Sequence, residues 1–135
     1  MAMVFWAHVA RGAALDCEGS DRLALYRHRH ALDALAHRLG LPRLDAMIDT
    51  TDLRFNFGEL ELPDDDPNAA MLESGVWCDA DRALLLFEGL DAALDVDASL
   101  DAKARVAVRE ELQGVLDFLR PRAVDGARFN LSVVM

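Results

Sequence analysis

Residues 127–134, Ala-Arg-Phe-Asn-Leu-Ser-Val-Val, decide the expected fold because their apolar and polar side chains alternate. Successive side chains of a β-strand point to opposite faces, so a period of two indicates a strand with one buried face. The aromatic and aliphatic residues then face a core, and the other face carries Arg128, Asn130 and Ser132. The pattern therefore predicts a half-buried strand.

Two further segments complete the predicted sheet. Residues 53–57, Leu-Arg-Phe-Asn-Phe, repeat the Arg-Phe-Asn tripeptide and alternate in the same way. Residues 2–9, Ala-Met-Val-Phe-Trp-Ala-His-Val, are apolar at both parities, which is typical of a central strand. We therefore expect a small sheet of about three strands, with the first strand between the other two.

Three segments carry apolar residues at helical spacing, and each follows a residue that can cap a helix. They cover residues 22–39 after Ser20 or Asp21, residues 80–94 after Asp79, and residues 100–120 after Ser99. A short helix is expected over 43–48, and residues 10–20 and 59–68 are interpreted as loops. The fold prediction is a single α+β domain over residues 1–135, with three main helices packed on one face of the sheet.

The composition limits the classes of protein that fit. A chain of 135 residues with 53% hydrophobic residues is long enough for a core, and Cys17 and Cys78 are too few for a disulfide framework. The net charge of −10 opposes binding to nucleic acids and to anionic membranes. No apolar run reaches the ~18–20 residues of a membrane span, and the N-terminus lacks the basic start of a signal peptide. We expect a cytoplasmic protein, and the use of arginine in place of lysine indicates a GC-rich bacterial source.

The polar positions of the three predicted strands form the candidate binding site. If both Phe-containing strands face the helices alike, the opposite face carries Trp6, His8, Arg54, Asn56, Arg128 and Asn130. Aromatic, imidazole, guanidinium and amide groups together offer stacking, anion pairing and directional hydrogen bonds. Such a face could hold a small anionic ligand or an acidic segment of a partner. An ordinary solvated sheet face is the more usual arrangement and the one expected.

A second candidate site lies on the first predicted helix. His30, Asp33 and His37 follow each other at i, i+3 and i+7, and imidazole and carboxylate both suit Zn or Fe. One helix supplies only half a site, so a solvated polar face is the alternative. Residues 64–68, Asp-Asp-Asp-Pro-Asn, match the opening of a calcium loop but lack its Gly and Glu, and we expect a solvated loop there.

No motif for nucleotide binding or nucleophilic catalysis occurs in the chain. We therefore predict no cofactor, and an enzyme is the less favoured class.

Three features of the chain occur together: Thr51-Asp52-Leu53 before an alternating segment, Trp77 before a Leu-rich helix, and the ending Phe129-x-Leu131-x-Val133-Val134-Met135. With them the chain resembles small uncharacterised bacterial proteins, a domain of unknown function, over most of its length. This resemblance implies no activity. By size and acidity the chain is also similar to immunity proteins, which block basic toxin enzymes, and that analogy implies a basic protein partner.

The acidic residues are concentrated in the middle of the chain. Residues 44–102 hold sixteen acids against Arg54 and Arg82, a balance of −14, whereas each flank carries a balance of +2. The leading hypothesis is therefore a non-enzymatic interaction protein whose region from Asp45 to Asp101 binds a basic partner, with association that weakens in salt. The runner-up is an enzyme that binds a small ligand at the sheet face or a metal at His30, Asp33 and His37. A homodimer formed through sheet faces or edges is a third possibility.

Overall fold

The computed structural model describes residues 3–56 and 67–135 of the chain, apart from the side chains of Asn56 and Pro67. Strands β1 (Val4–Arg11) and β2 (Ala14–Cys17) come first. The other elements follow in the order α1 (Leu23–Arg27), α2 (Arg29–Arg38), η1 (Leu44–Met47), β3 (Ile48–Asp49), α3 (Thr51–Asn56), α4 (Pro67–Ser74), β4 (Cys78–Asp79), α5 (Ala80–Leu94), α6 (Ala102–Leu119), η2 (Arg120–Arg122) and β5 (Arg128–Val134). The α+β class is confirmed, but the described residues form five strands and six α-helices rather than about three of each.

Strand β5 holds the sheet together. It pairs antiparallel with β1, parallel with β3 and, toward its start, antiparallel with β4. Strand β1 also pairs antiparallel with β2, which gives the order β2-β1-β5-β3, with β4 also on β5. The first and last predicted strands are thus confirmed, although β1 lies between β2 and β5 rather than beside a strand over residues 53–57.

The loop predicted over residues 10–20 contains strand β2 instead. The turn that joins β1 to β2 includes Gly12, whose φ of 58° is the left-handed region that glycine adopts without strain. Strand β2 is short and mostly exposed, and it lacks the β-branched and aromatic residues that indicate a strand. Pairing with β1, rather than a local signal, therefore forms this strand.

The predicted strand over residues 53–57 is wrong, because helix α3 covers the part of it that the structure describes. The buried carboxylate of Asp49 accepts hydrogen bonds from the backbone N–H and the hydroxyl of Thr51, at 3.1 and 3.0 Å. Such a carboxylate stabilises the free N–H groups of a first helical turn. The N–H of Arg54 then donates to the carbonyl of Thr50 at 2.9 Å, a helical bond from i to i−4. A five-residue alternation is too short to outweigh this helix start.

The predicted helices are confirmed with different ends. The segment over 22–39 divides into α1 and α2 at His28, whose φ of −103° and ψ of 15° are not helical. Helix α5 matches the prediction, and α6 begins after Asp101, whose carboxylate accepts from the N–H of Ala104 at 2.8 Å. Asp101, and not Ser99, is therefore the N-cap of α6.

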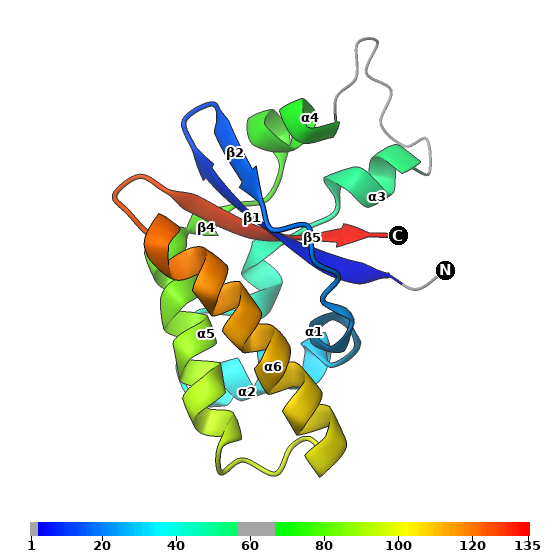
Figure 1. The fold of residues 1–135 in the computed structure, drawn as a ribbon, viewed down its shortest axis with the longest axis vertical. Coiled ribbons are helices and arrows are strands. Elements are labelled where there is room, and N and C mark those ends of the chain that lie inside the picture. Colours follow the sequence, from blue (N-terminus) through cyan, green and yellow to red (C-terminus); the bar gives the residue numbers. More distant parts are fainter. Residues whose placement is uncertain (1–2, 57–66) are drawn as a thin grey trace.

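Helices cover both faces of the sheet and not one face as predicted (Figure 1). Helices α1, α2, α5 and α6 lie on one side, and α3 and α4 lie on the other. The polar positions of β5 are consequently buried, with Asn130 0% exposed and Ser132 1% exposed. What was expected to be a solvated sheet face is thus an interior surface.

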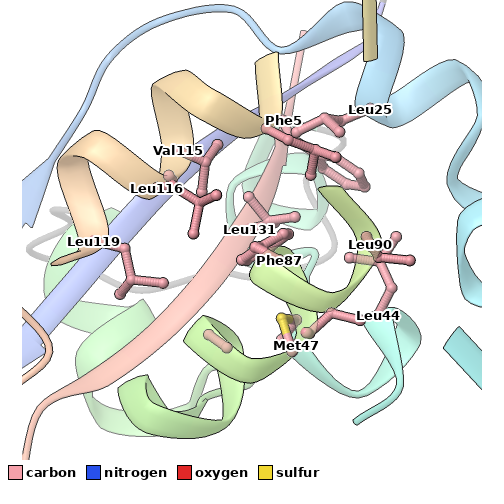
Figure 2. Packing of buried hydrophobic residues seen from close by; sticks show 14 of the residues in the cluster. Phe5, Leu25, Leu44, Met47, Phe87, Leu90, Val115, Leu116, Leu119 and Leu131 are labelled. Atoms are coloured by element: carbon pink, nitrogen blue, oxygen red, sulfur yellow. The ribbon is translucent and has the colours of Figure 1, made fainter. Parts of the chain in front are cut away.

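The hydrophobic core lies between the sheet and the larger helix layer. Phe129 of β5 meets Phe87 of α5 edge to face, with ring centroids 5.4 Å apart. Figure 2 shows side chains of α5, α6 and β5, among them Phe87, Leu116 and Leu131, converging in this layer. The prediction that Phe129 faces the helices is confirmed.

Candidate functional site

The candidate site is built on the polar face of β1 and β5, which carries Trp6, His8, Asn130 and Ser132. In the antiparallel register Trp6 is opposite Ser132, and His8 is opposite Asn130. On the other side of β1, Cys17 of β2 is opposite His8. Directly opposite residues of an antiparallel pair have side chains on the same face. The register therefore places Cys17, His8 and Asn130 in one row across three strands.

A pocket of about 210 Å³ opens on this polar face. Trp6, His8, Cys17 and Ser132 line it from the sheet. The rest of the lining comes from Asp52 of α3, from α4, and from the end of the chain. An apolar cavity of about 150 Å³ is enough to hold benzene. The pocket is therefore large enough for a small ring compound.

His8 and Asn130 are buried polar side chains with incomplete hydrogen bonding. His8 is 4% exposed and Asn130 is 0% exposed. Nδ2 of Asn130 donates to the carbonyl of Val76 at 3.0 Å, but Oδ1 of Asn130 and Nδ1 of His8 have no partner in the described part of the chain. An unsatisfied buried polar group costs about 1–3 kcal/mol, and most buried groups avoid it. Polar residues that reduce stability in this way are typical of functional sites.

Burial favours the neutral form of the His8 imidazole. Burial is the largest influence and lowers the pKa of His8 below its ordinary value of 6.5, while Asn130 and the carboxylates of Asp49 and Asp52 offset part of this effect. Of the two ring nitrogens only Nδ1 is fully enclosed without a partner. Because His8 lines the pocket, Nε2 is the nitrogen that can meet a ligand.

The buried carboxylate of Asp49 fastens the layer that covers the polar face. Besides Thr51 it accepts from the N–H of Val76 at 2.9 Å, so it joins β3, α3 and the segment after α4. The approach is close at Gly75, where a Cβ would lie 2.9 Å from Oδ1 of Asp49. Nε1 of Trp77 donates to the carbonyl of Met71 at 2.9 Å. These contacts hold α4 beside the pocket.

Four of the six predicted site residues lie on the polar face, namely Trp6, His8, Arg128 and Asn130. Arg54 is exposed on α3, and the guanidinium of Arg128 lies over the ring of Trp77, 5.0 Å from its centroid. Neither arginine lines the pocket. The side chain of Asn56 lies outside the described residues. The predicted arginine pair is not assembled because residues 51–56 are helical.

The sequence analysis missed several pocket residues. Ser132 could have been found, because it has the same parity as Asn130 in the predicted strand. Cys17 and Asn68 lie in segments that were interpreted as loops, and Asp52 and Met71 were assigned to no element. They reach the pocket only because β2, α3 and α4 pack around β1, and no local pattern carries that information.

The guanidinium of Arg43 occupies the place where a metal bound by Asp33 and His37 would lie. Nε of Arg43 donates to Oδ1 of Asp33 at 3.0 Å, with a second bond to the other carboxylate oxygen, and Nη1 of Arg43 lies 3.3 Å from Nδ1 of His37. This guanidinium holds the pKa of Asp33 below its usual range. Within residues 3–56 and 67–135, no three His, Cys, Asp or Glu side chains are grouped so as to hold a metal. The calcium-loop fragment falls mostly outside the described residues.

Among the helices that the described residues form, none combines the length and apolar character that crossing a bilayer requires. The chain matches no family model, no curated protein and no solved structure. This outcome agrees with the sequence resemblance, which implies no activity, so function must be inferred from the chemistry of the site.

Proposed function

We propose that this protein binds a small polar molecule, neutral or positively charged, in the pocket beside His8. The observation that carries the proposal is the buried cross-strand pair of His8 and Asn130, in which a ring nitrogen and an amide oxygen lack partners. The pair adjoins a pocket of about 210 Å³. Few convergent polar groups in a partly apolar pocket are typical of a small-molecule site.

The charge of the pocket supports a ligand that is not an anion. Asp52 is the charged side chain in its described lining, and burial favours the neutral form of His8. Like charges repel, so an anionic ligand is disfavoured. This sign is opposite to that of the anionic ligand that the sequence suggested.

The ring of Trp6 supports a ligand with a flat group. Nε1 of Trp6 donates to the carboxylate of Asp21 at 2.7 Å, which fixes the orientation of the indole. Trp6 lines the pocket, and an indole ring can stack on a flat group or attract a cation. Nε2 of His8 and the hydroxyl of Ser132 provide polar contacts nearby.

Titration with three matched probes tests the proposal: benzamide, benzylamine and benzoate share a ring and differ in charge. In two-dimensional NMR spectra we expect benzamide and benzylamine to shift the indole N–H signal of Trp6 in a saturable way at millimolar concentration. Benzoate should shift it much less. Trp77 is the internal comparison: it does not line the pocket, although its indole N–H donates to the carbonyl of Met71, which does, so its signal should shift less than that of Trp6.

A pair of variants separates the pocket from general surface binding. His8→Phe should strongly reduce the saturable shifts because it removes the imidazole nitrogens from the pocket lining, whereas His30→Phe, on an exposed helix position, should leave them unchanged. Absence of saturable shifts with all three probes on the wild-type protein, or a preference for benzoate, would contradict the proposal.

A second candidate function is the acidic interaction module expected from the sequence. Arginines of the two flanks already pair with part of the acidic middle, as in Arg38–Asp97 at 3.5 Å, Arg109–Asp91 at 3.2 Å, Arg109–Asp95 at 3.0 Å and Arg120–Glu88 at 3.4 Å. Glu73, Asp79 and Asp81, in contrast, are exposed and form no ion pair with a described residue. These three carboxylates favour a basic partner over this part of the surface.

Calorimetric titration with an arginine-rich peptide tests this second candidate. Binding should be measurable at low salt, weaken at high salt, and fall in the Glu73→Lys/Asp81→Lys variant. The matched control is Asp91→Lys/Asp95→Lys, which changes the charge equally, because both carboxylates already have Arg109 as their partner. Equal binding by both variants would count against a docking surface at Glu73 and Asp81.

A further inference from the structure

The strand register places three side chains in a row across β2, β1 and β5: Cys17, His8 and Asn130. His8 is the register partner of Cys17 on one side and of Asn130 on the other. Directly opposite residues have Cβ atoms about 4.5–5.5 Å apart, within reach of a thiol–imidazole contact after rotation about the Cys side-chain bond. Cys17 and His8 also line the same pocket. The imidazole therefore lies between a thiol and an amide.

The imidazole of this row is placed to act as a base. It is 4% exposed, and its enclosed Nδ1 lies in the same cross-strand pair as the unpartnered Oδ1 of Asn130. The amide of Asn130 is held from the other end by its bond to the carbonyl of Val76. In the tautomer that carries its proton on Nδ1, Nε2 keeps a free lone pair, and His8 lines the pocket together with Cys17. That lone pair is the acceptor that a thiol on β2 requires.

The thiol of Cys17 needs such help to ionise. Partial burial, together with the carboxylate of Glu18, raises the pKa of Cys17 above its ordinary value of 9.0, although a backbone bond from Gly19 acts in the other direction. The protonated thiol is consequently favoured at neutral pH, so without a base the thiol reacts slowly, through its small thiolate fraction. The carboxylates of Asp49 and Asp52, which face His8 from β3 and α3, favour an imidazolium once a proton is transferred.

We propose that Cys17 is a nucleophile toward neutral carbon electrophiles and that His8 accepts its proton. In the reaction a bond forms between Sγ of Cys17 and the electrophilic carbon, while the thiol proton moves to Nε2 of His8. The bond from that carbon to its leaving group breaks, and the leaving group departs with the bonding electron pair. With an acyl thioester the departing thiolate takes the proton back from His8, so the imidazole is regenerated.

The negative character of the pocket determines which electrophiles fit. Asp52 lines the pocket beside the row, so a neutral reagent enters more readily than an anionic one. Iodoacetamide and iodoacetate are a matched pair for this purpose because they differ in charge and share the same reactive carbon and leaving group. The inference therefore predicts a selectivity that a simple exposed thiol would not show.

The chain also supplies a control thiol. Cys78 lies on β4, is half-buried, and burial with the nearby Asp79 raises its pKa to about 11. It is the register partner of Phe129, whose side chain packs on the apolar face, and it does not line the pocket. Cys78 thus reports the reactivity of a thiol in the same protein without His8.

The experiment measures the rate of alkylation of Cys17 by mass spectrometry in the Cys78→Ala protein across neutral and mildly alkaline pH. With His8 as base, the rate should be nearly independent of pH on both sides of neutrality. In His8→Gln it should be at least about tenfold lower at pH 7 and rise about tenfold per pH unit, since only free thiolate then reacts. Iodoacetate should be disfavoured relative to iodoacetamide more strongly than with a free small thiol.

Parallel pH profiles for the His8→Gln and unsubstituted proteins would overturn the inference, as would equal selectivity for the two reagents. The profile of the protein with His8 intact is decisive without any substitution at that position, so a poorly folded His8 variant leaves the test valid. In Cys17→Ser the remaining Cys78 should react slowly, and His8→Gln should not change that rate. Since no ligand is added, failure here leaves the binding proposal standing, and absence of probe binding leaves this inference standing.

Discussion

On one face of the β1–β5 pair, Phe5, Phe129 and Leu131 pack against helices, whereas on the other face His8 and Asn130 lie beneath a second helix layer. All five side chains are less than 5% exposed. The first face is stabilised by hydrophobic burial and dispersion, which have no directional requirement. The second needs directional partners, and two of its atoms lack them. The two faces are equally buried, but burial stabilises the fold on the apolar face, whereas on the polar face it leaves groups that are available for binding and chemistry.

The two helix layers that cover the sheet also differ in what holds them in place. Helices α5 and α6 are long and bury a continuous apolar stripe against the sheet. Helices α3 and α4 are short, and the contacts described around them depend on the buried carboxylate of Asp49 and on backbone groups near Gly75. A layer held by a few directional bonds leaves room for a pocket, which a close-packed apolar layer does not.

The largest expected effect of a substitution lies on the apolar face. Phe87→Ala removes a fully buried ring and its contact with Phe129, and should lower the free energy of unfolding by about 3–5 kcal/mol. Leu85→Ala, at a 59% exposed position of the same helix, should change it by less than about 0.5 kcal/mol. Urea denaturation measures both variants, and comparable losses would break the distinction between core and surface on α5.

An intermediate effect is expected where the second layer is fastened. Asp49→Ala removes the acceptor of three hydrogen bonds and should lower the free energy of unfolding by about 2–3 kcal/mol. Asp49→Asn keeps part of the bonding and should cost less. The control is Asp125→Ala, at an exposed position. A loss no greater than that of the control would show that Asp49 does not hold the polar side together.

The smallest effect is the dependence of stability on pH. The pKa of His8 is lower in the folded protein than its ordinary value of 6.5, so the unfolded chain binds the proton first as pH falls. Below pH ~6.5 the free energy of unfolding should therefore decrease, by at most about 1.4 kcal/mol per pH unit.

Denaturation of the wild-type protein and His8→Gln, at about pH 7.5 and about pH 5.5, isolates this contribution as the difference between their slopes. His30→Gln, at an exposed position, serves as the control and should keep the wild-type slope. A slope in His8→Gln equal to that of the wild type would mean that burial of His8 is not a source of pH sensitivity.

The spacing of apolar residues was sufficient to predict an element where the segment is long or where tertiary contacts favour the same secondary structure. It predicted β1, β5, α5 and most of α6, and the parity of β5 correctly separated Phe129 from Asn130. It also brought Trp6, His8 and Asn130 to one face, because cross-strand register preserves parity. It failed at residues 53–56, the described part of the predicted strand 53–57, where the helix start at Asp49 and Thr51 overrides the alternation.

The sequence by itself thus determined the α+β class, the two long strands and the helices that bury an apolar stripe, because these follow from side-chain spacing along the chain. Only the tertiary structure decided that α3 and α4 cover the polar face, that Cys17 lies opposite His8, and that Asp52 enters the pocket. Such contacts join segments far apart in sequence, and they form through packing and hydrogen bonds that no local pattern records. For the same reason the arginines of the flanks pair with the acidic middle only in the folded chain.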